Sequence, residues 1–178
     1  MEEWVWDGGR PSIDLINTVR DRARDARETL RTPDDLALWL RTARLFDGDV
    51  DGDDLTATRA LRAAIDALAY PADGSSPTGS VEVVNTAAAE APSGPRLALT
   101  DGRLVTVPAE PSVAAALGRV ALDAIDLVTG KDLLRVCAAD DCGIRFVDRS
   151  PARNRQWCSM RRCGNRTKAR RHYARTGR

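Results

Sequence analysis

Residues 137–163 read CAADDCGIRFVDRSPARNRQWCSMRRC and hold all four cysteines of the 178-residue chain. The cysteines form two C-x4-C pairs, Cys137 with Cys142 and Cys158 with Cys163, separated by 15 residues. Two close pairs at this separation are typical of a tetrahedral zinc site. The alternative is two disulfides or unpaired thiols, and disulfides are rare in cytoplasmic proteins. We therefore expect one structural Zn²⁺ whose four thiolate ligands leave no open coordination position.

The residues around the cysteines predict a knuckle, a hairpin and a helix. In chain order, the expected elements are a knuckle over 137–142, strands over 144–147 and 155–157, and a helix from Ser159 to about Tyr173. Residues five apart on a regular helix differ in direction by about 140°. Cys158 should therefore precede the helix, and Cys163 should lie in its first turns. This order of elements predicts a treble-clef-like zinc finger.

The cysteine-rich end of the chain also carries most of the positive charge. The formal net charge is only +1. Residues 145–178 nevertheless contain 12 Lys or Arg and one acidic residue, whereas residues 1–144 contain 15 basic and 25 acidic residues. This asymmetry favours a nucleic-acid partner. We expect DNA, with two alternatives: RNA, or an acidic protein surface on which the basic tail docks.

The predicted C-terminal helix carries a stripe of arginines. Arg162, Arg166 and Arg170 recur every four residues, and no acidic residue follows Asp148. Like charges at this spacing repel one another, and a bound polyanion would relieve the repulsion. Asn165 either reads a base or hydrogen-bonds the backbone near the zinc. The predicted nucleic-acid contacts are Arg153, Arg155, Arg161, Arg162, Asn165, Arg166, Lys168, Arg170, Arg171 and Arg175.

Short motifs in this region resemble a known family. Residues 157–159 (WCS), residues 163–166 (CGNR) and Lys168 resemble the CGNR zinc finger, a bacterial family named for that tetrapeptide. The resemblance covers about residues 133–175 and includes all four cysteines. It implies a structural zinc finger over residues 131–178.

The front of the chain carries a second, shorter resemblance. Residues 13–18, IDLINT, resemble the opening motif of the ABATE domain, with which the CGNR finger is typically paired. The pairing implies a stress-induced transcription regulator with an ABATE-like body over residues 1–130. That body would sense a signal, or dimerise.

The pattern of the front residues predicts a mostly helical body with a small sheet. The expected elements are a strand over 4–6, helices starting near Ser12, Thr32, Asp54, Ser80 and Pro111, a loop over 71–80 and a hairpin over 96–107. In the hairpin, Asp101-Gly102 favours a type I′ turn. The whole chain is therefore expected to be α+β, mostly α.

One polar group in the front body is a candidate ligand site. Asp14, Asn17 and Arg20 lie within two turns of one predicted helix. They either bind a small-molecule effector or form a buried hydrogen-bond network, because buried polar groups need partners. The residues alone leave both alternatives open.

Several classes of protein are excluded by what the sequence lacks. The single histidine, His172, lies in the basic tail, and no HExxH, GxSxG or phosphate-binding glycine loop occurs. We therefore expect no enzymatic activity. No apolar run reaches the roughly 20 residues of a membrane span, and the start lacks a signal-peptide pattern. We therefore expect a cytoplasmic protein. A homodimer is a possible form of it, because one finger alone gives little sequence specificity.

Overall fold

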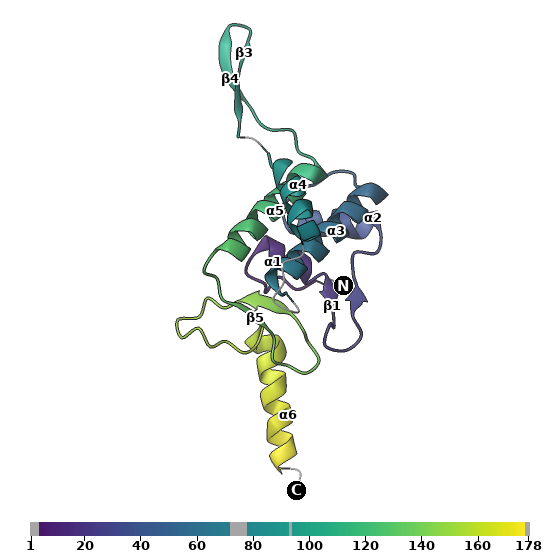
Figure 1. The fold of residues 1–178 in the computed structure, drawn as a ribbon, viewed down its shortest axis with the longest axis vertical. Helices are drawn as coiled ribbons and strands as arrows, with labels where there is room; N and C mark the ends of the chain where they lie inside the picture. The colour runs from purple at the N-terminus through teal and green to yellow at the C-terminus, as the bar shows by residue number, and fades with distance from the viewer. Residues whose placement is uncertain (1–3, 72–77, 93, 177–178) are drawn as a thin grey trace. The chain divides into compact units, whose positions relative to one another are not determined.

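The computed structural model describes residues 4–71, 78–92 and 94–176 (Figure 1). The chain divides into two compact units, one of Met1–Arg31 with Asp126–Arg178 and the other of Thr32–Ile125. In the described residues, the first unit contains two antiparallel strand pairs and the second contains one, and both contain helices, which confirms the α+β, mostly α class. None of the helices in the described ranges combines the length and apolar composition of a transmembrane span.

The unit Thr32–Ile125 is built mainly from helices. Its elements are α2 (Pro33–Thr42), α3 (Gly52–Ala69), α4 (Thr78–Ala89), the hairpin strands β3 (Arg96–Thr100) and β4 (Arg103–Val107), and most of α5 (Val113–Thr129). Capping boxes at Thr32 and Asp51 start α2 and α3, because each side chain accepts a hydrogen bond from the backbone three residues later. The fully buried side chains include Leu36, Trp39, Leu40, Leu61, Ile65 and Val120.

Two predictions in this unit can be compared with the structure. Helix α4 begins at Thr78, two residues before the predicted start, while residues 72–77 of the predicted loop lie outside the described residues. The hairpin pairs Leu99 with Leu104, and Asp101 and Gly102 have φ angles of 51° and 74°. Positive φ at both central residues is the signature of a type I′ turn, so the predicted hairpin is confirmed.

The other unit combines both ends of the chain. Its elements are α1 (Pro11–Ile16), β1 (Val19–Arg20), β2 (Arg27–Glu28), β5 (Leu134–Val136), β6 (Arg145–Val147), the π-helical turn η1 (Met160–Gly164) and α6 (Asn165–Thr176). Residues 4–6 form no strand, contrary to the prediction. The sequence boundary predicted at residue 130 and the two compact units describe different divisions, and the division into domains over residues 1–130 and 131–178 stays a prediction.

The hairpin of the cysteine-rich segment differs from the one predicted. Strand β6 pairs with β5, on the opposite side of the knuckle, rather than with residues 155–157. The Arg155 N–H donates instead to the Asp148 carboxylate (2.8 Å), which draws that backbone away from a ladder. The knuckle of the cysteine-rich segment therefore lies at the tip of the β5–β6 hairpin, and the treble-clef classification stays a prediction.

Candidate metal centre and basic helix

The four cysteines form one buried cluster. Their Sγ atoms all lie within 4.8 Å of one another. The Cys142–Cys158 and Cys158–Cys163 sulfur separations are both 3.7 Å. A tetrahedral site with Zn–S bonds of about 2.3 Å requires sulfurs about 3.8 Å apart, whereas a disulfide joins them at about 2.0 Å. The cluster therefore fits one zinc ion and not two disulfides.

The first cysteine pair is held by the knuckle at the tip of the hairpin. The Cys137 N–H donates to the Ile144 carbonyl (2.8 Å), and the Cys142 N–H donates to the Ala139 carbonyl (3.1 Å). Gly143, directly after Cys142, has φ +69°, a conformation that favours glycine. These contacts close the loop so that both thiols face the same point.

The second pair is held by an unusual helix start. The Ser159 carbonyl accepts hydrogen bonds from both Cys163 (2.9 Å) and Gly164 (3.0 Å), which forms the π-helical turn η1. Cys158 thus precedes the helix, and Cys163 lies in its first turn, as predicted. The Ala138 N–H donates to the Gln156 carbonyl (2.8 Å) and links the knuckle to this second segment. Single π turns of this kind are frequent at functional sites.

The four clustered thiols shift one another's pKa values, and hydrogen bonds from Cys142 and Cys158 lower the pKa of the Cys137 thiol. Hydrogen bonding with Cys137 and burial raise the pKa of the Cys142 thiol to about 12. Hydrogen bonds from Cys137 and Cys142, together with burial, raise the pKa of the Cys158 thiol as well. A bound zinc ion supplies the positive charge that stabilises all four thiolates, so metal binding and proton release are coupled.

A buried carboxylate organises the segment between the two cysteine pairs. Asp148 accepts hydrogen bonds from the N–H and hydroxyl of Ser150 (3.0 and 2.6 Å), from the Arg155 N–H (2.8 Å) and from Arg135 Nε (3.0 Å). Burial opposes ionisation of Asp148, but the hydrogen bonds from Ser150, Arg155 and Arg135 outweigh it and lower its pKa to about 2. The sequence did not predict this role of Asp148, because Arg135 and Arg155 come within hydrogen-bonding distance of it only once the segment has folded.

One predicted nucleic-acid contact serves the finger itself. The Arg155 guanidinium donates to the carbonyls of Trp157 and Cys158. It also lies 4.6 Å from the centre of the buried Phe146 ring, within cation–π distance. Arg155 therefore stabilises the backbone at Trp157 and Cys158, where the second cysteine pair begins.

The arginine stripe, with Arg162 on η1 and Arg166 and Arg170 on α6, is paired with acids from distant parts of the sequence. Arg166 and Arg170 contact the two carboxylate oxygens of Asp141 at 2.6 and 3.1 Å, and Arg162 contacts Asp7 at 3.1 Å. Burial opposes ionisation of Asp141, but the interactions with Arg170 and Arg166 outweigh it and lower its pKa. The sequence argument, which considered only acids after Asp148, was wrong to expect the repulsion to be unrelieved.

The remaining predicted contacts lie mostly at the surface. Arg161 and Lys168 are exposed, as is Asn165 at the start of α6. Arg153 is exposed and donates to the Lys131 carbonyl (3.3 Å). Arg171 and Arg175 lie on the same helix, but their side chains are outside the described set. These residues thus lie on η1, on α6, which is drawn in yellow in Figure 1, and on the loop before them.

Comparison with known families agrees with this geometry. A family model named ABATE, described as "Putative stress-induced transcription regulator", matches residues 9–131. The chain belongs to the ABATE family. A CGNR zinc finger model matches residues 134–176, which contain the whole cysteine cluster. Neither ABATE nor CGNR is described as an enzyme family. No curated protein matches the chain significantly.

The ABATE opening motif supports the finger directly. The buried Asn17 side chain donates to the Arg145 carbonyl (2.8 Å) and accepts from the Arg145 N–H (3.0 Å). Asp14 accepts from the Gly8 N–H (2.9 Å). Helix α1 ends at Ile16, so Arg20 lies in β1 and not on the predicted helix, and burial lowers its pKa. These bonds support a structural role for Asp14 and Asn17, and binding of an effector by the three residues stays a prediction.

Proposed function

We propose that this ABATE protein is a bacterial transcription regulator that binds duplex DNA through α6 of its zinc finger. The observation that carries the proposal is the set of basic side chains gathered on one helix whose start is fixed by the metal cluster. Arg161 and Lys168 are exposed on it, and Arg162, Arg166 and Arg170 remain 40%, 41% and 58% exposed beside their carboxylates. The major groove of DNA admits an α-helix, and its phosphates attract such a charge.

The paired carboxylates give the stripe a defined role. Asp141 holds Arg166 and Arg170 side by side, so its carboxylate competes with a DNA phosphate for both guanidinium groups. A DNA phosphate presents acceptor oxygens of the same kind and can replace the carboxylate. Contacts to phosphate position a protein without reading sequence. Asn165, which is exposed at the start of α6, would then read base edges, as the first residues of recognition helices do.

The zinc ion has a structural role in this proposal. Cys137, Cys142, Cys158 and Cys163 would hold it, and four thiolates leave no coordination position for a substrate. The protein would act in the cytoplasm, where thiols stay reduced. The front body would then sense a signal, with the surroundings of α1 as the first region to test.

The test uses the zinc-loaded full chain and a pool of random duplex DNA at about 50 and about 200 mM salt. Replacing Arg162, Arg166 and Arg170 together by glutamine should lower the salt slope of binding by about 0.9 for each phosphate that the protein no longer neutralises. The matched control replaces three exposed arginines of the other unit, Arg41, Arg44 and Arg119, and should leave the slope unchanged.

The recovered sequences decide between the alternatives. An enriched motif supports a sequence-specific regulator, and a palindromic motif also supports a dimer. Salt-sensitive binding without enrichment, or displacement by structured RNA in preference to duplex, contradicts the proposal and favours an RNA-associated role. No binding at either salt concentration favours docking of α6 on an acidic protein.

A further inference from the structure

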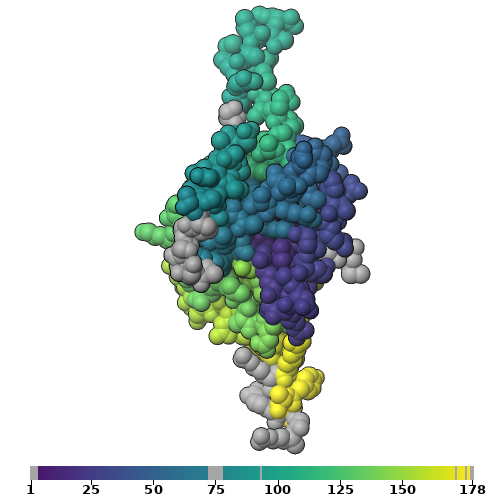
Figure 2. Space-filling model, turned by 45° about the vertical axis from the view of Figure 1, so that its right-hand side comes forward, coloured from purple at the N-terminus to yellow at the C-terminus, as the bar shows by residue number. Residues whose placement is uncertain are grey.

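The β3–β4 hairpin exposes an apolar face that a soluble protein normally covers. Leu97, Leu99 and Leu104 are 71%, 70% and 70% exposed. Leu99 lies opposite Leu104, and Leu97 is two residues away on the same strand, so the three side chains share one face. The two strands form a sheet of their own, and their atoms lie at the surface in Figure 2. A lone two-stranded hairpin is at best marginally stable in water. Burial of the three leucines against another surface would therefore stabilise it.

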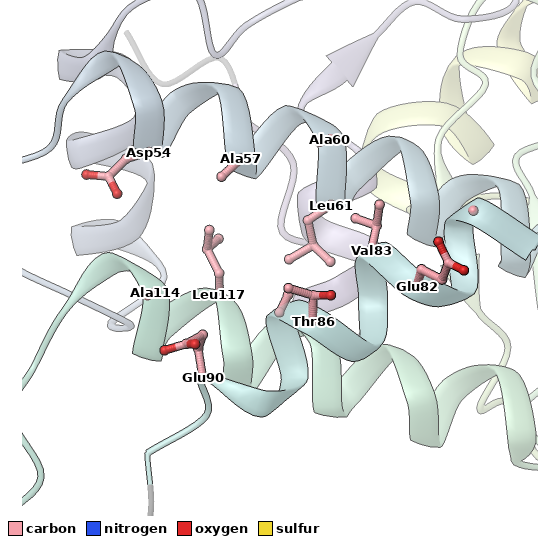
Figure 3. A pocket seen from close by; sticks show the side chains of 12 residues that line it. Asp54, Ala57, Ala60, Leu61, Glu82, Val83, Thr86, Glu90, Ala114 and Leu117 are labelled. Atoms are coloured by element: carbon pink, nitrogen blue, oxygen red, sulfur yellow. The ribbon is translucent and has the colours of Figure 1, made fainter.

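The same unit contains an apolar groove between α3, α4 and α5. The groove has a volume of about 510 Å³. Its apolar lining includes Ala57, Ala60, Leu61, Val83 and Leu117. In Figure 3, Leu61 and Leu117 point into the space between the helices.

Carboxylates stand at both ends of this groove. Asp54 and Glu90 lie at one end and Glu82 at the other (Figure 3). Eight residues along the α4 segment separate Glu82 from Glu90, a span of about 12 Å at 1.5 Å per residue. The groove therefore offers an apolar floor with negative charge at each end.

The hairpin carries the opposite charges at a matching distance. Arg96 lies at its base and Arg103 beside its turn, and both are exposed. Four ladder rows separate them, a span of about 14 Å at roughly 3.4 Å per row. The arginines stand on the face opposite the leucines, and their long side chains can reach around the ribbon while the leucines are buried. The spacing of the two arginines, about 14 Å, is thus close to the spacing of about 12 Å between the carboxylates at the ends of the groove.

The hairpin's connections prevent it from folding back onto its own groove. Pro92 and Pro95 precede the hairpin, and Pro108 and Pro111 follow it. Proline fixes φ and restricts the residue before it, so each of these four prolines limits the paths that its connection can take. Glu90, at the start of the first connection, already lines one end of the groove. A reversal within so few restricted residues is unfavourable, whereas a second copy faces no such constraint.

We propose that two copies of this chain exchange hairpins, the leucine face of each β3–β4 hairpin filling the α3–α4–α5 groove of the other copy. The rim carboxylates Asp54, Glu82 and Glu90 then pair with Arg96 and Arg103. The exchange is reciprocal, so it closes as a twofold dimer with two identical contacts. It does not depend on DNA binding, but it would present two zinc fingers to a twofold-symmetric site.

Sedimentation equilibrium of the zinc-loaded full chain tests the proposal. The wild-type protein should form a dimer with a measurable Kd. Leu99→Asp removes an apolar side chain from the hairpin face, and Ala60→Trp fills part of the groove that this face would occupy. Each change should raise the dimer Kd by about 30-fold or more, the size of effect seen at central interface positions. Both positions are exposed in one copy, so the fold should survive. Leu104→Asp repeats the hairpin test if circular dichroism shows that Leu99→Asp fails to fold.

Matched controls lie at exposed positions outside the groove and the hairpin. Leu38→Asp on α2 and Ala63→Trp on α3 introduce the same side chains and should leave the dimer Kd unchanged. Dissociation of the dimer in either control would show that general surface chemistry, and not the hairpin and groove, controls association. That result would overturn the proposal.

Mixing the two defective variants gives the sharpest test. The Ala60→Trp copy keeps a working hairpin and the Leu99→Asp copy keeps a working groove, so the mixture should form more dimer than either variant alone. A contact between two hairpins would leave Ala60→Trp dimeric and predicts no rescue. A monomeric wild-type protein, a dimer unaffected by Ala60→Trp, or absence of rescue would each overturn the hairpin exchange.

Discussion

Replacing Asn17 by alanine tests how the front of the chain supports the zinc finger. The Asn17 side chain is 1% exposed and makes two hydrogen bonds with the backbone of Arg145, at 2.8 and 3.0 Å. Arg145 begins β6 and lies between Ile144 and Phe146, which pack around the cysteine sulfurs. The substitution therefore removes a polar support from the strand that carries part of the metal-site core.

The structure sets the size of the effect. Alanine takes away the partner of one backbone N–H and of one carbonyl in a site where water has little access. A buried polar group that loses its partner costs about 1–3 kcal/mol. For the two groups together, we expect Asn17→Ala to lower the free energy of unfolding by roughly 2–6 kcal/mol. That is a large fraction of the roughly 5–15 kcal/mol that stabilises a typical domain.

Urea unfolding of the zinc-loaded protein measures this destabilisation, and competition with a chelator measures zinc retention. The matched control is Asn165→Ala, because Asn165 is exposed and its replacement should change stability by less than about 0.5 kcal/mol. Asn17→Asp separates the two bonds, since it keeps an acceptor for the Arg145 N–H and removes the donor. An Asn17→Ala protein with wild-type stability and zinc retention would refute the structural role and return Asn17 to the ligand hypothesis.

Substitutions at three other positions test the finger more briefly. Cys158→Ser removes a zinc ligand, so zinc content and the helicity of the finger should fall while the front helices survive; unchanged metal content and circular dichroism would contradict the metal site. Asp141→Asn frees Arg166 and Arg170, so DNA should bind about two- to tenfold more tightly in a binding titration, and equal or weaker binding would argue against those arginines as DNA contacts. Gly143→Ala forces a side chain onto φ +69° and should cost about 1–2 kcal/mol in urea unfolding, whereas a neutral effect would mean that the turn relaxes.

The metal cluster was predictable because its information is local. Two cysteine pairs within 27 residues, with a helix start at the second pair, were enough to place all four thiols and to order Cys158 and Cys163 along the chain. The hairpin over 96–107 was predictable for the same reason, since Asp101-Gly102 specifies its turn.

The contacts that sequence reasoning missed are those between distant residues. Asp141 lies 25 and 29 residues from its two arginines, and Asn17 lies 128 residues from Arg145. No periodicity or motif connects such positions, because the pairing arises only when the unit has folded. Strand β6 was predicted correctly, but its partner was not, since a nearby segment with strand-like residues competed with β5.

These distant contacts change how the family boundary is understood. The ABATE and CGNR matches meet between residues 131 and 134, yet the edge of β6 that faces away from β5 is occupied by the front of the chain. There, the Val147 N–H donates to the Gly8 carbonyl (3.0 Å), and Asn17 binds both backbone groups of Arg145. An open strand edge is a site of unwanted pairing, and these contacts close it. The ABATE motif is therefore part of the scaffold that holds the zinc finger, so a change of structure around α1 would act directly on β6 and on the metal-site core beside it.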